Sequence, residues 1–300
     1  MNQWQALLIG TRPPTLLLGI SPVLLGSALG VSQILGQGDS IKPSNIVVFV
    51  LAIVSVVLMQ SAANLVNDVK DAETGVDGEG RKGPLRMVQA GLLSRDFAVK
   101  AYRVMLGVSV LLGLGLSFYG GKTTIILAVI CSLVAYLYTG GPKPLSHLGL
   151  GEIVALIFFG PVAVLGSAYL QSLTWQWQDL FWSLGPGFLA AAVMAINNLR
   201  DRRGDSKVGK LTLAVKLSDK WGQQLPWLLI MMSLIVFLSY SLWNNVWVGG
   251  LAISFIFLQL LRKFVQPLLF PKADLLNQAL KKTSLFVAVY CLLYAIVVML

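Results

Sequence analysis

The stretch IVVFVLAIVSVVLMQSAANLVNDVKDAETGVD, residues 46–77, decides the fold of this chain. It begins with about twenty almost unbroken apolar residues, the length that an α-helix needs to cross the hydrocarbon core of a bilayer. Acids then follow at once, because five carboxylates fall within twelve residues: Asp68, Asp71, Glu73, Asp77 and Glu79. A membrane-spanning helix therefore ends in a cluster of side chains that repel one another, which calls for a counter-charge.

The whole chain has the composition of a membrane protein. It has 300 residues, of which 56% are hydrophobic and 12% charged, too few charges to cover the surface of a soluble protein. Apolar runs of spanning length recur along it. The sequence therefore predicts an all-α, polytopic fold with one transmembrane domain, residues 1–300. Its nine expected spans are roughly 14–35, 45–67, 98–119, 123–139, 152–171, 178–199, 225–243, 246–264 and 283–300.

The basic residues predict how these spans are oriented. With the N-terminus inside, every one of the 23 Lys and Arg residues except Lys42 and Lys122 falls on the inner side. Such an imbalance is typical of cytoplasmic loops. The net charge of +10 is then explained by topology and an anionic inner leaflet, so no nucleic-acid partner is expected.

Two helical faces gather oxygen-bearing side chains at span ends. One follows the second span at spacings i, i+3, i+4 and i+7: Asn64, Asn67, Asp68 and Asp71. The other follows the sixth span at i, i+4 and i+8: Asn197, Asp201 and Asp205. Acids on one face repel unless a cation lies between them, and oxygen-only ligands suit Mg²⁺. Asp71 and Asp201 are the strongest candidates for metal ligands.

The two acidic faces share the pattern Asn-x-x-x-Asp at an offset of 130 residues, which suggests an internal duplication. Basic residues follow or surround the two faces in the sequence: Arg81, Lys82, Arg86, Arg202, Arg203, Lys207 and Lys210. Lys143 lies in another loop that is expected on the same side of the membrane. Acids and bases together predict a site for a metal and a phosphorylated ligand. Lys207, Lys216 and Lys220 are better explained as solvated loop charges.

Several segments resemble the UbiA-type intramembrane aromatic prenyltransferases: NDVKDAETGVD (67–77), GPLR (83–86), YTGGPKPLSHLGLGE (138–152) and NNLRDRRGDSKVGKLTLAVKLS (197–218). The opening RPPTLLLGISPVLLGSALG (12–30) is similar to the first helix of the branch that prenylates 1,4-dihydroxy-2-naphthoate for menaquinone. The third acid, Asp77, stands six residues after Asp71, whereas the 4-hydroxybenzoate branch places it four after, at Gly75. That spacing favours the naphthoate branch, although Ser206 and Ser218 depart from its usual pattern.

The resemblance implies nine spans around a central cavity open to lipid, in a bacterial inner membrane with the Asp-rich loops on the cytoplasmic side. It implies that Mg²⁺ and a polyprenyl diphosphate bind between the two motifs. The polyprenyl group would pass to 1,4-dihydroxy-2-naphthoate with loss of CO₂, giving demethylmenaquinone. The implied metal ligands are Asn64, Asn67, Asp68, Asp71, Asp77, Asn197, Asp201 and Asp205. The implied diphosphate ligands are Arg81, Arg86, Lys143, Lys210, Asn67 and Asn197, and the implied catalytic residues are Asp71, Asp201, Tyr138 and Lys143.

Three alternatives stay open at the level of sequence. The acceptor could be 4-hydroxybenzoate, or the donor could carry a phytyl group for phylloquinone. A secondary transporter for an anion also uses repeats and polar groups, but within the membrane. Here the acids lie at span ends and the middles of the spans carry no charge, which argues against transport. Tyr138 either contacts the diphosphate or the cation, or only packs at the interface.

Overall fold

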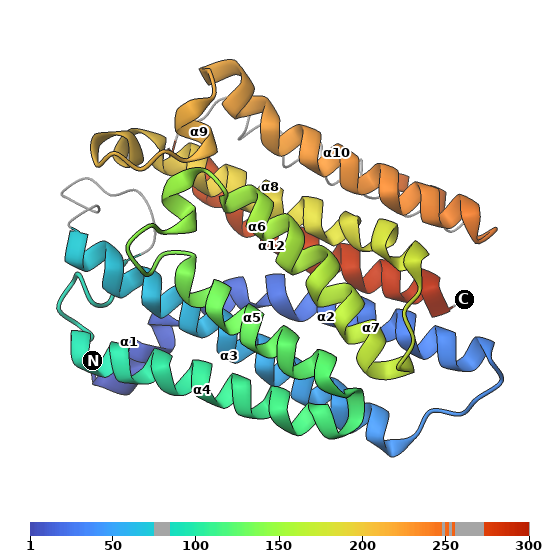
Figure 1. Ribbon diagram of the computed structural model, residues 1–300. Helices are drawn as coiled ribbons and strands as arrows, with labels where there is room; N and C mark the ends of the chain where they lie inside the picture. Colours follow the sequence, from blue (N-terminus) through green and yellow to red (C-terminus); the bar gives the residue numbers. More distant parts are fainter. Residues whose placement is uncertain (75–84, 248–249, 252–253, 256–272, 300) are drawn as a thin grey trace.

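The computed structural model describes residues 1–74, 85–247, 250–251, 254–255 and 273–299 (Figure 1). Every regular element among them is helical, which confirms the all-α prediction. The main helices are α1 (Gln3–Gly10), α2 (Pro13–Gly36), α3 (Pro43–Thr74), α4 (Arg95–Gly120), α5 (Lys122–Leu137), α6 (Gly151–Ile157), α7 (Ala163–Ser172), α8 (Trp177–Lys207), α9 (Leu213–Lys216), α10 (Asp219–Trp243) and α12 (Ala273–Met299). The short turns η1 (Leu145–Leu148) and η2 (Phe158–Val162) complete the described elements.

Seven segments of the described residues are long and apolar enough to cross a membrane: α2, α3, α4, the combined α6–η2–α7, α8, α10 and α12. The shorter apolar helix α5 corresponds to the expected span 123–139. The expected span 246–264 lies largely outside the described residues. A polytopic helical membrane protein is thus confirmed, whereas nine remains a predicted number of spans, and the internal duplication and single-domain boundary stay predictions as well.

Small residues let the helices of the bundle approach closely. Helix α2 packs along α7, and a β-carbon at Gly26 would overlap the backbone carbonyl of Val164. Glycines at helix interfaces bring backbones together in this way where lipid gives no hydrophobic drive. The largest buried cluster joins α2, α7, α8, α10 and α12 and includes Leu25, Phe237, Tyr290 and Tyr294. A second cluster joins α1, α3 and α4.

The span expected at 152–171 is confirmed as Gly151–Ser172, and a bend interrupts its regular α-helix. Helix α6 passes through a π-helical turn into α7, and Gly160 within the turn has non-helical torsions of φ −101° and ψ −105°. Pro161 cannot donate a backbone hydrogen bond there, so the helix bends. A side chain at Gly160 would lie 3.0 Å from the Cα of Gly187, so the bend brings this span against α8.

Helices α3 and α8 run on beyond the expected span ends at residues 67 and 199. Each continues for about two more turns, to Thr74 and Lys207. Both acidic faces are therefore helical rather than part of loops. The two helix ends lie at the same end of the bundle, beside α9 and the N-terminus (Figure 1). This end is called the polar end below.

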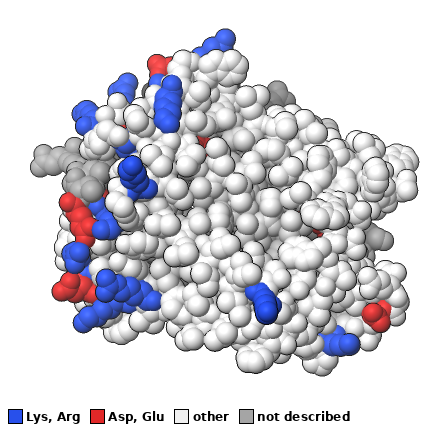
Figure 2. Space-filling model, in the orientation of Figure 1, with Lys and Arg blue, Asp and Glu red and all other residues white. Residues whose placement is uncertain are grey.

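Charge is distributed unevenly over the molecule. Figure 2 shows one face, on which most Lys, Arg, Asp and Glu residues gather at the polar end while the broad middle is largely white. Large apolar side chains are exposed around the bundle, among them Leu111, Phe118 and Trp177. An apolar belt of this kind, with its charges at the ends, is what a bilayer requires of the protein surface.

Candidate active site

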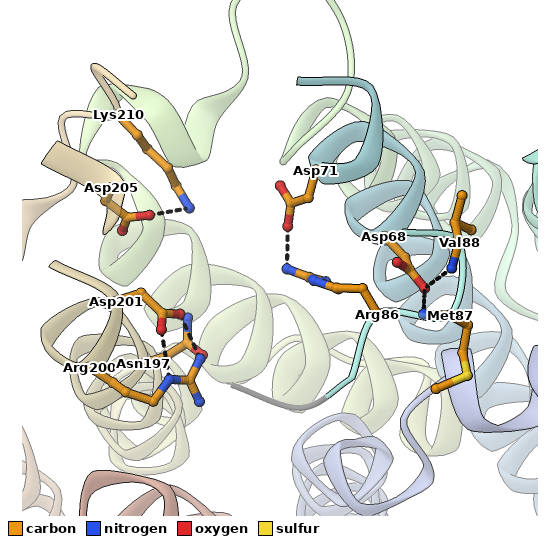
Figure 3. A network of polar contacts seen from close by, with 10 residues as sticks. All are labelled: Asp68, Asp71, Arg86, Met87, Val88, Asn197, Arg200, Asp201, Asp205 and Lys210. Atoms are coloured by element: carbon orange, nitrogen blue, oxygen red, sulfur yellow. Dashed lines mark hydrogen bonds and ion pairs between the residues drawn. The ribbon is translucent and has the colours of Figure 1, made fainter. Parts of the chain in front are cut away.

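The last turns of α3 and α8 face each other at the polar end (Figure 3). Asp68 and Asp71 come from α3, whereas Asp201 and Asp205 come from α8. Arg86 and Lys210 extend between the two helix ends in the same view. The structure therefore brings together acids that are 130 residues apart in the sequence, with cations among them.

The end of α3 is neutralised by a segment that follows it in the sequence. Asp68 is buried, and its Oδ2 accepts hydrogen bonds from the backbone N–H groups of Met87 at 2.9 Å and Val88 at 3.4 Å. Asp71 forms a buried ion pair with Arg86. Backbone amides and a guanidinium both stabilise an ionised carboxylate in a dry environment. Residues 86–88 therefore act as the counter-charge of the first acidic face.

The two asparagines of α3 have different surroundings. Asn64 Nδ2 donates to the backbone oxygen of Thr11 at 2.8 Å and to Thr15 Oγ1 at 3.2 Å, which ties α3 to the start of α2. Asn67 lines the cavity, and its Oδ1 is buried without a hydrogen-bond partner among the described residues. A buried carbonyl oxygen of this kind is costly unless it meets a donor or a cation.

The end of α8 is neutralised within its own helix and the turn that follows. Arg200 holds Asp201 through Nε–Oδ1 at 2.8 Å and Nη2–Oδ2 at 2.6 Å, a two-pronged carboxylate contact. The same guanidinium donates to Asn197 Oδ1 at 2.9 Å and to Asn277 Oδ1 of α12 at 3.1 Å. Arg200 is not among the predicted site residues, because neighbours at i and i+1 do not normally share a helical face.

Lys210 returns to the buried Asp205 after a sharp turn. Its Nζ lies 3.3 Å from Asp205 Oδ1, and its backbone N–H donates to the Asp205 carbonyl at 2.9 Å. Gly209 makes this return possible because its φ of +72° lies in the left-handed region that glycine adopts without strain. Asp205 Oδ2 is buried and accepts no hydrogen bond from the described residues.

Between these helix ends opens a cavity of about 370 Å³. Its interior is mostly apolar and is lined by side chains of α2, α3, α5, α7 and α8. Its polar lining residues include Arg12, Asn64, Asn67, Tyr138, Asn197, Asn198 and Lys210. An apolar chamber with charges only at its mouth suits a ligand that has one anionic end and one greasy end.

The remaining predicted site residues lie in different places. Tyr138 lines the cavity, and its hydroxyl donates to Met194 Sδ at 3.1 Å. Lys143 is exposed in the loop before η1 and is not among the residues that line the cavity. Asp77 and Arg81 lie outside the described residues. Arg12, which is not among the predicted site residues, lines the cavity as well.

The donor atoms at this end fit a hard divalent cation. Asn67 Oδ1 and Asp205 Oδ2 are buried oxygens without a hydrogen-bond partner in the described part of the chain. No three His, Cys, Asp or Glu side chains of that part come close enough to hold a metal ion by themselves. Mg²⁺ is commonly bound by one or two carboxylates together with waters and substrate phosphates, so the arrangement fits Mg²⁺ shared with a phosphorylated ligand.

Comparisons with known proteins give the chain its relatives. Residues 20–268 match the model of the UbiA prenyltransferase family. A 1,4-dihydroxy-2-naphthoate octaprenyltransferase from Mycobacterium tuberculosis is 36% identical over 217 residues, which cover 72% of this chain and 70% of that protein. The Escherichia coli protein of the same name is 34% identical over 256 residues, covering 81% and 80%. A UbiA homologue from Archaeoglobus fulgidus, solved bound to GPP and Mg²⁺, superposes with a TM-score of 0.66 at 14% identity. The superposition covers 98% of this chain and 99% of that one, so the two proteins share the fold.

Proposed function

Because this chain belongs to the UbiA prenyltransferase family, we propose that it transfers a polyprenyl group from a prenyl diphosphate to 1,4-dihydroxy-2-naphthoate, with Mg²⁺, giving demethylmenaquinol, the reduced form of demethylmenaquinone. The observation that carries the proposal is the pair of acidic helix ends facing each other over an apolar cavity (Figure 3). The names of the relatives support the naphthoate acceptor.

The mouth of the cavity would bind the diphosphate and stabilise it as a leaving group. Lys210 and Arg86 supply positive charge there, and Arg200 holds the carboxylate of Asp201 in place. Asn67, Asp71, Asp201 and Asp205 would hold Mg²⁺, which when bound adds positive charge against the departing diphosphate. Arg86, which pairs with Asp71 in the structure, would also be available to the phosphate oxygens, and Asp71 would then be one of the residues available to hold the metal.

The chemistry needs no nucleophilic side chain. The carbon–oxygen bond of the donor breaks and its electron pair leaves with the diphosphate, so the allylic carbon becomes an electrophile. The electron-rich ring forms the new carbon–carbon bond, and the ring regains aromaticity when the bond to its carboxylate breaks and CO₂ leaves. The apolar lining of the cavity excludes water that would otherwise capture the cation.

The location of the reaction follows from the polyprenyl tail. Each buried methylene contributes about 0.8 kcal/mol, so a long tail stays in the bilayer while only its diphosphate reaches the polar end. We place the polar end at the cytoplasmic side of the inner membrane. The segments next to the two acidic faces carry most of the Lys and Arg residues, as cytoplasmic loops do. Nearly neutral span interiors then match the lipid core.

Purified protein with labelled polyprenyl diphosphate, one acceptor at a time, and Mg²⁺ or EDTA tests the proposal. We expect a Mg²⁺-dependent lipid product from 1,4-dihydroxy-2-naphthoate, identified by mass spectrometry together with released diphosphate and CO₂. A preference for 4-hydroxybenzoate or for a phytyl donor would contradict the acceptor or the donor. Movement of an anion across liposomes without any product would contradict the enzyme.

A further inference from the structure

A buried carboxylate stands directly behind the cavity wall, although the mechanism above does not use it. Glu152, in the first turn of α6, is 5% exposed, and its Oε1 accepts a hydrogen bond from Asn198 Nδ2 of α8 at 2.9 Å. Its Oε2 is buried without a hydrogen-bond partner among the described residues. A buried acid with one of its oxygens unpartnered is costly, so a structural explanation alone is poor.

The acid determines which end of the Asn198 amide faces the cavity. Because the Asn198 NH₂ group donates to Glu152 Oε1, the amide carbonyl oxygen is turned away from the acid. Asn198 lines the cavity, and Oδ1 accepts no hydrogen bond from the described part of the chain. The pair therefore presents a fixed hydrogen-bond acceptor to whatever occupies this part of the cavity.

The surroundings of that acceptor suit a flat ring. Tyr138 and Met194 line the cavity beside Asn198, and the Tyr138 hydroxyl already bonds to the Met194 sulfur. A side chain at Gly151 would lie 3.0 Å from Tyr138 Oη and 3.5 Å from Asn198 Nδ2, so these groups converge where α6 begins. Sulfur and aromatic side chains make favourable contacts with an aromatic ring.

Neither the metal nor the diphosphate is the natural partner of this oxygen. Asn198 comes one residue after Asn197, which on a helix turns its side chain about 100° away from the face of Asn197, Asp201 and Asp205. A diphosphate offers only oxygens that accept hydrogen bonds, whereas a carbonyl oxygen needs a donor. A hydroxyl on an aromatic ring supplies that donor.

We propose that Asn198, Tyr138 and Met194 form the binding site of the aromatic acceptor, with Asn198 Oδ1 accepting a hydrogen bond from a ring hydroxyl and Glu152 acting as the positioning residue that orients the amide. The proposal rests on the proposed function, because it names the site at which the naphthoate of that reaction binds.

The test measures KM for the acceptor separately from KM for the prenyl diphosphate. For Glu152→Leu we expect an acceptor KM about tenfold higher, with the donor KM and the Mg²⁺ concentration for half-maximal activity unchanged within about twofold. Glu152→Gln, whose amide oxygen still accepts from Asn198, should keep an acceptor KM close to that of the original chain. A change in the Mg²⁺ requirement or in the donor KM instead would overturn the proposal.

A pair of the same chemistry elsewhere gives the matched control. Asp179 is also 5% exposed and accepts from Gln33 Nε2 at 2.6 Å, but neither residue lines the cavity. The two pairs lie about 28 Å apart along α8, from residue 179 to residue 198. Asp179→Leu should lower thermal stability and leave the acceptor KM unchanged. An equal rise in acceptor KM in this variant would mean that lost stability explains the effect, and would overturn the positioning role.

A second measurement covers the case in which Glu152→Leu does not fold. The two mono-O-methyl ethers of 1,4-dihydroxy-2-naphthoate serve as competitive inhibitors, because each lacks one hydroxyl donor. One ether should bind the original chain about tenfold more weakly than the other. In Asn198→Asp combined with Glu152→Gln, the hydrogen bond is reversed and a carboxylate oxygen faces the cavity, so this discrimination should increase. Equal binding of both ethers in both proteins overturns the proposal. If the original chain forms no prenylated naphthoate at all, the proposed function fails as well.

Discussion

The ends of α3 and α8 carry similar acids but neutralise them in different ways. The acids of α3 depend on Arg86 and the amides of Met87 and Val88, which return from beyond the helix. Those of α8 depend on Arg200 in the same helix and Lys210 in the following turn. A counter-charge in the same helix or its next turn is placed as soon as that helix forms. A counter-charge from a later segment is placed only when that segment packs back against the helix. The α8 end is therefore preformed, and the α3 end is coupled to the conformation of residues 86–88.

The largest expected effect is a loss of kcat, and it tests whether both helix ends take part in one reaction. Asp71→Ala and Asp201→Ala should each lower kcat by about 10³-fold or more, because each removes a group that helps hold the charge on the leaving diphosphate. Turnover of labelled prenyl diphosphate is measured, with insertion and thermal unfolding as controls for folding. Near-normal activity in either variant would show that only one helix end takes part.

A smaller effect is a loss of unfolding free energy, which should differ between the two helix ends. Arg86→Met should lower the free energy of unfolding by about 3 kcal/mol, since it leaves Asp71, whose side chain is 12% exposed, without its buried cation. Arg200→Met should cost about 1 kcal/mol, because the Asp201 side chain is 28% exposed and water can partly replace the guanidinium. Unfolding in detergent measures both values. The reverse order would break the distinction between remote and local neutralisation.

The preformed end also offers a comparison of two lysines three residues apart. Lys210→Met should raise KM for the prenyl diphosphate about tenfold, since a charge-assisted contact at the cavity mouth is lost. Lys207 is exposed and does not line the cavity, so Lys207→Met should leave that KM unchanged. Steady-state kinetics with a series of donor concentrations distinguishes the two. Equal shifts would mean that only the overall charge of the turn matters.

The smallest expected effect is a change in stability, and it tests the role of the turn at Gly209. Gly209→Ala should lower stability by about 1 kcal/mol, because its φ of +72° strains any side chain even though nothing lies within 4 Å. Gly204→Ala, inside α8 and equally open, should raise it by a similar amount, as alanine favours a helix more than glycine. Thermal unfolding of the two variants should shift in opposite directions. Shifts in the same direction would contradict the claim that the turn requires glycine at residue 209.

Sequence reasoning succeeded where a pattern is local. Hydropathy predicted the spans, and helical spacing grouped the acids that the structure brings to one end. It failed where contacts are set by packing between distant segments, such as the pairing of Glu152 with Asn198 across 46 residues. The role of Lys143 stays a prediction, since its resemblance to a site position does not determine where its exposed loop turns. The bend at Gly160–Pro161 had a readable signal in the dipeptide itself.

Charges at one end of the cavity and apolar walls elsewhere imply separate exits for the diphosphate and the prenylated product of the proposed reaction. The released inorganic anion returns to water on the same side from which the soluble aromatic compound arrives. The newly made quinol precursor, by contrast, already lies among hydrocarbon chains and diffuses sideways to its next enzyme. No step requires a long hydrocarbon to pass through an aqueous compartment. The asymmetry of the cavity therefore lets each of these two products leave into the medium in which it is soluble.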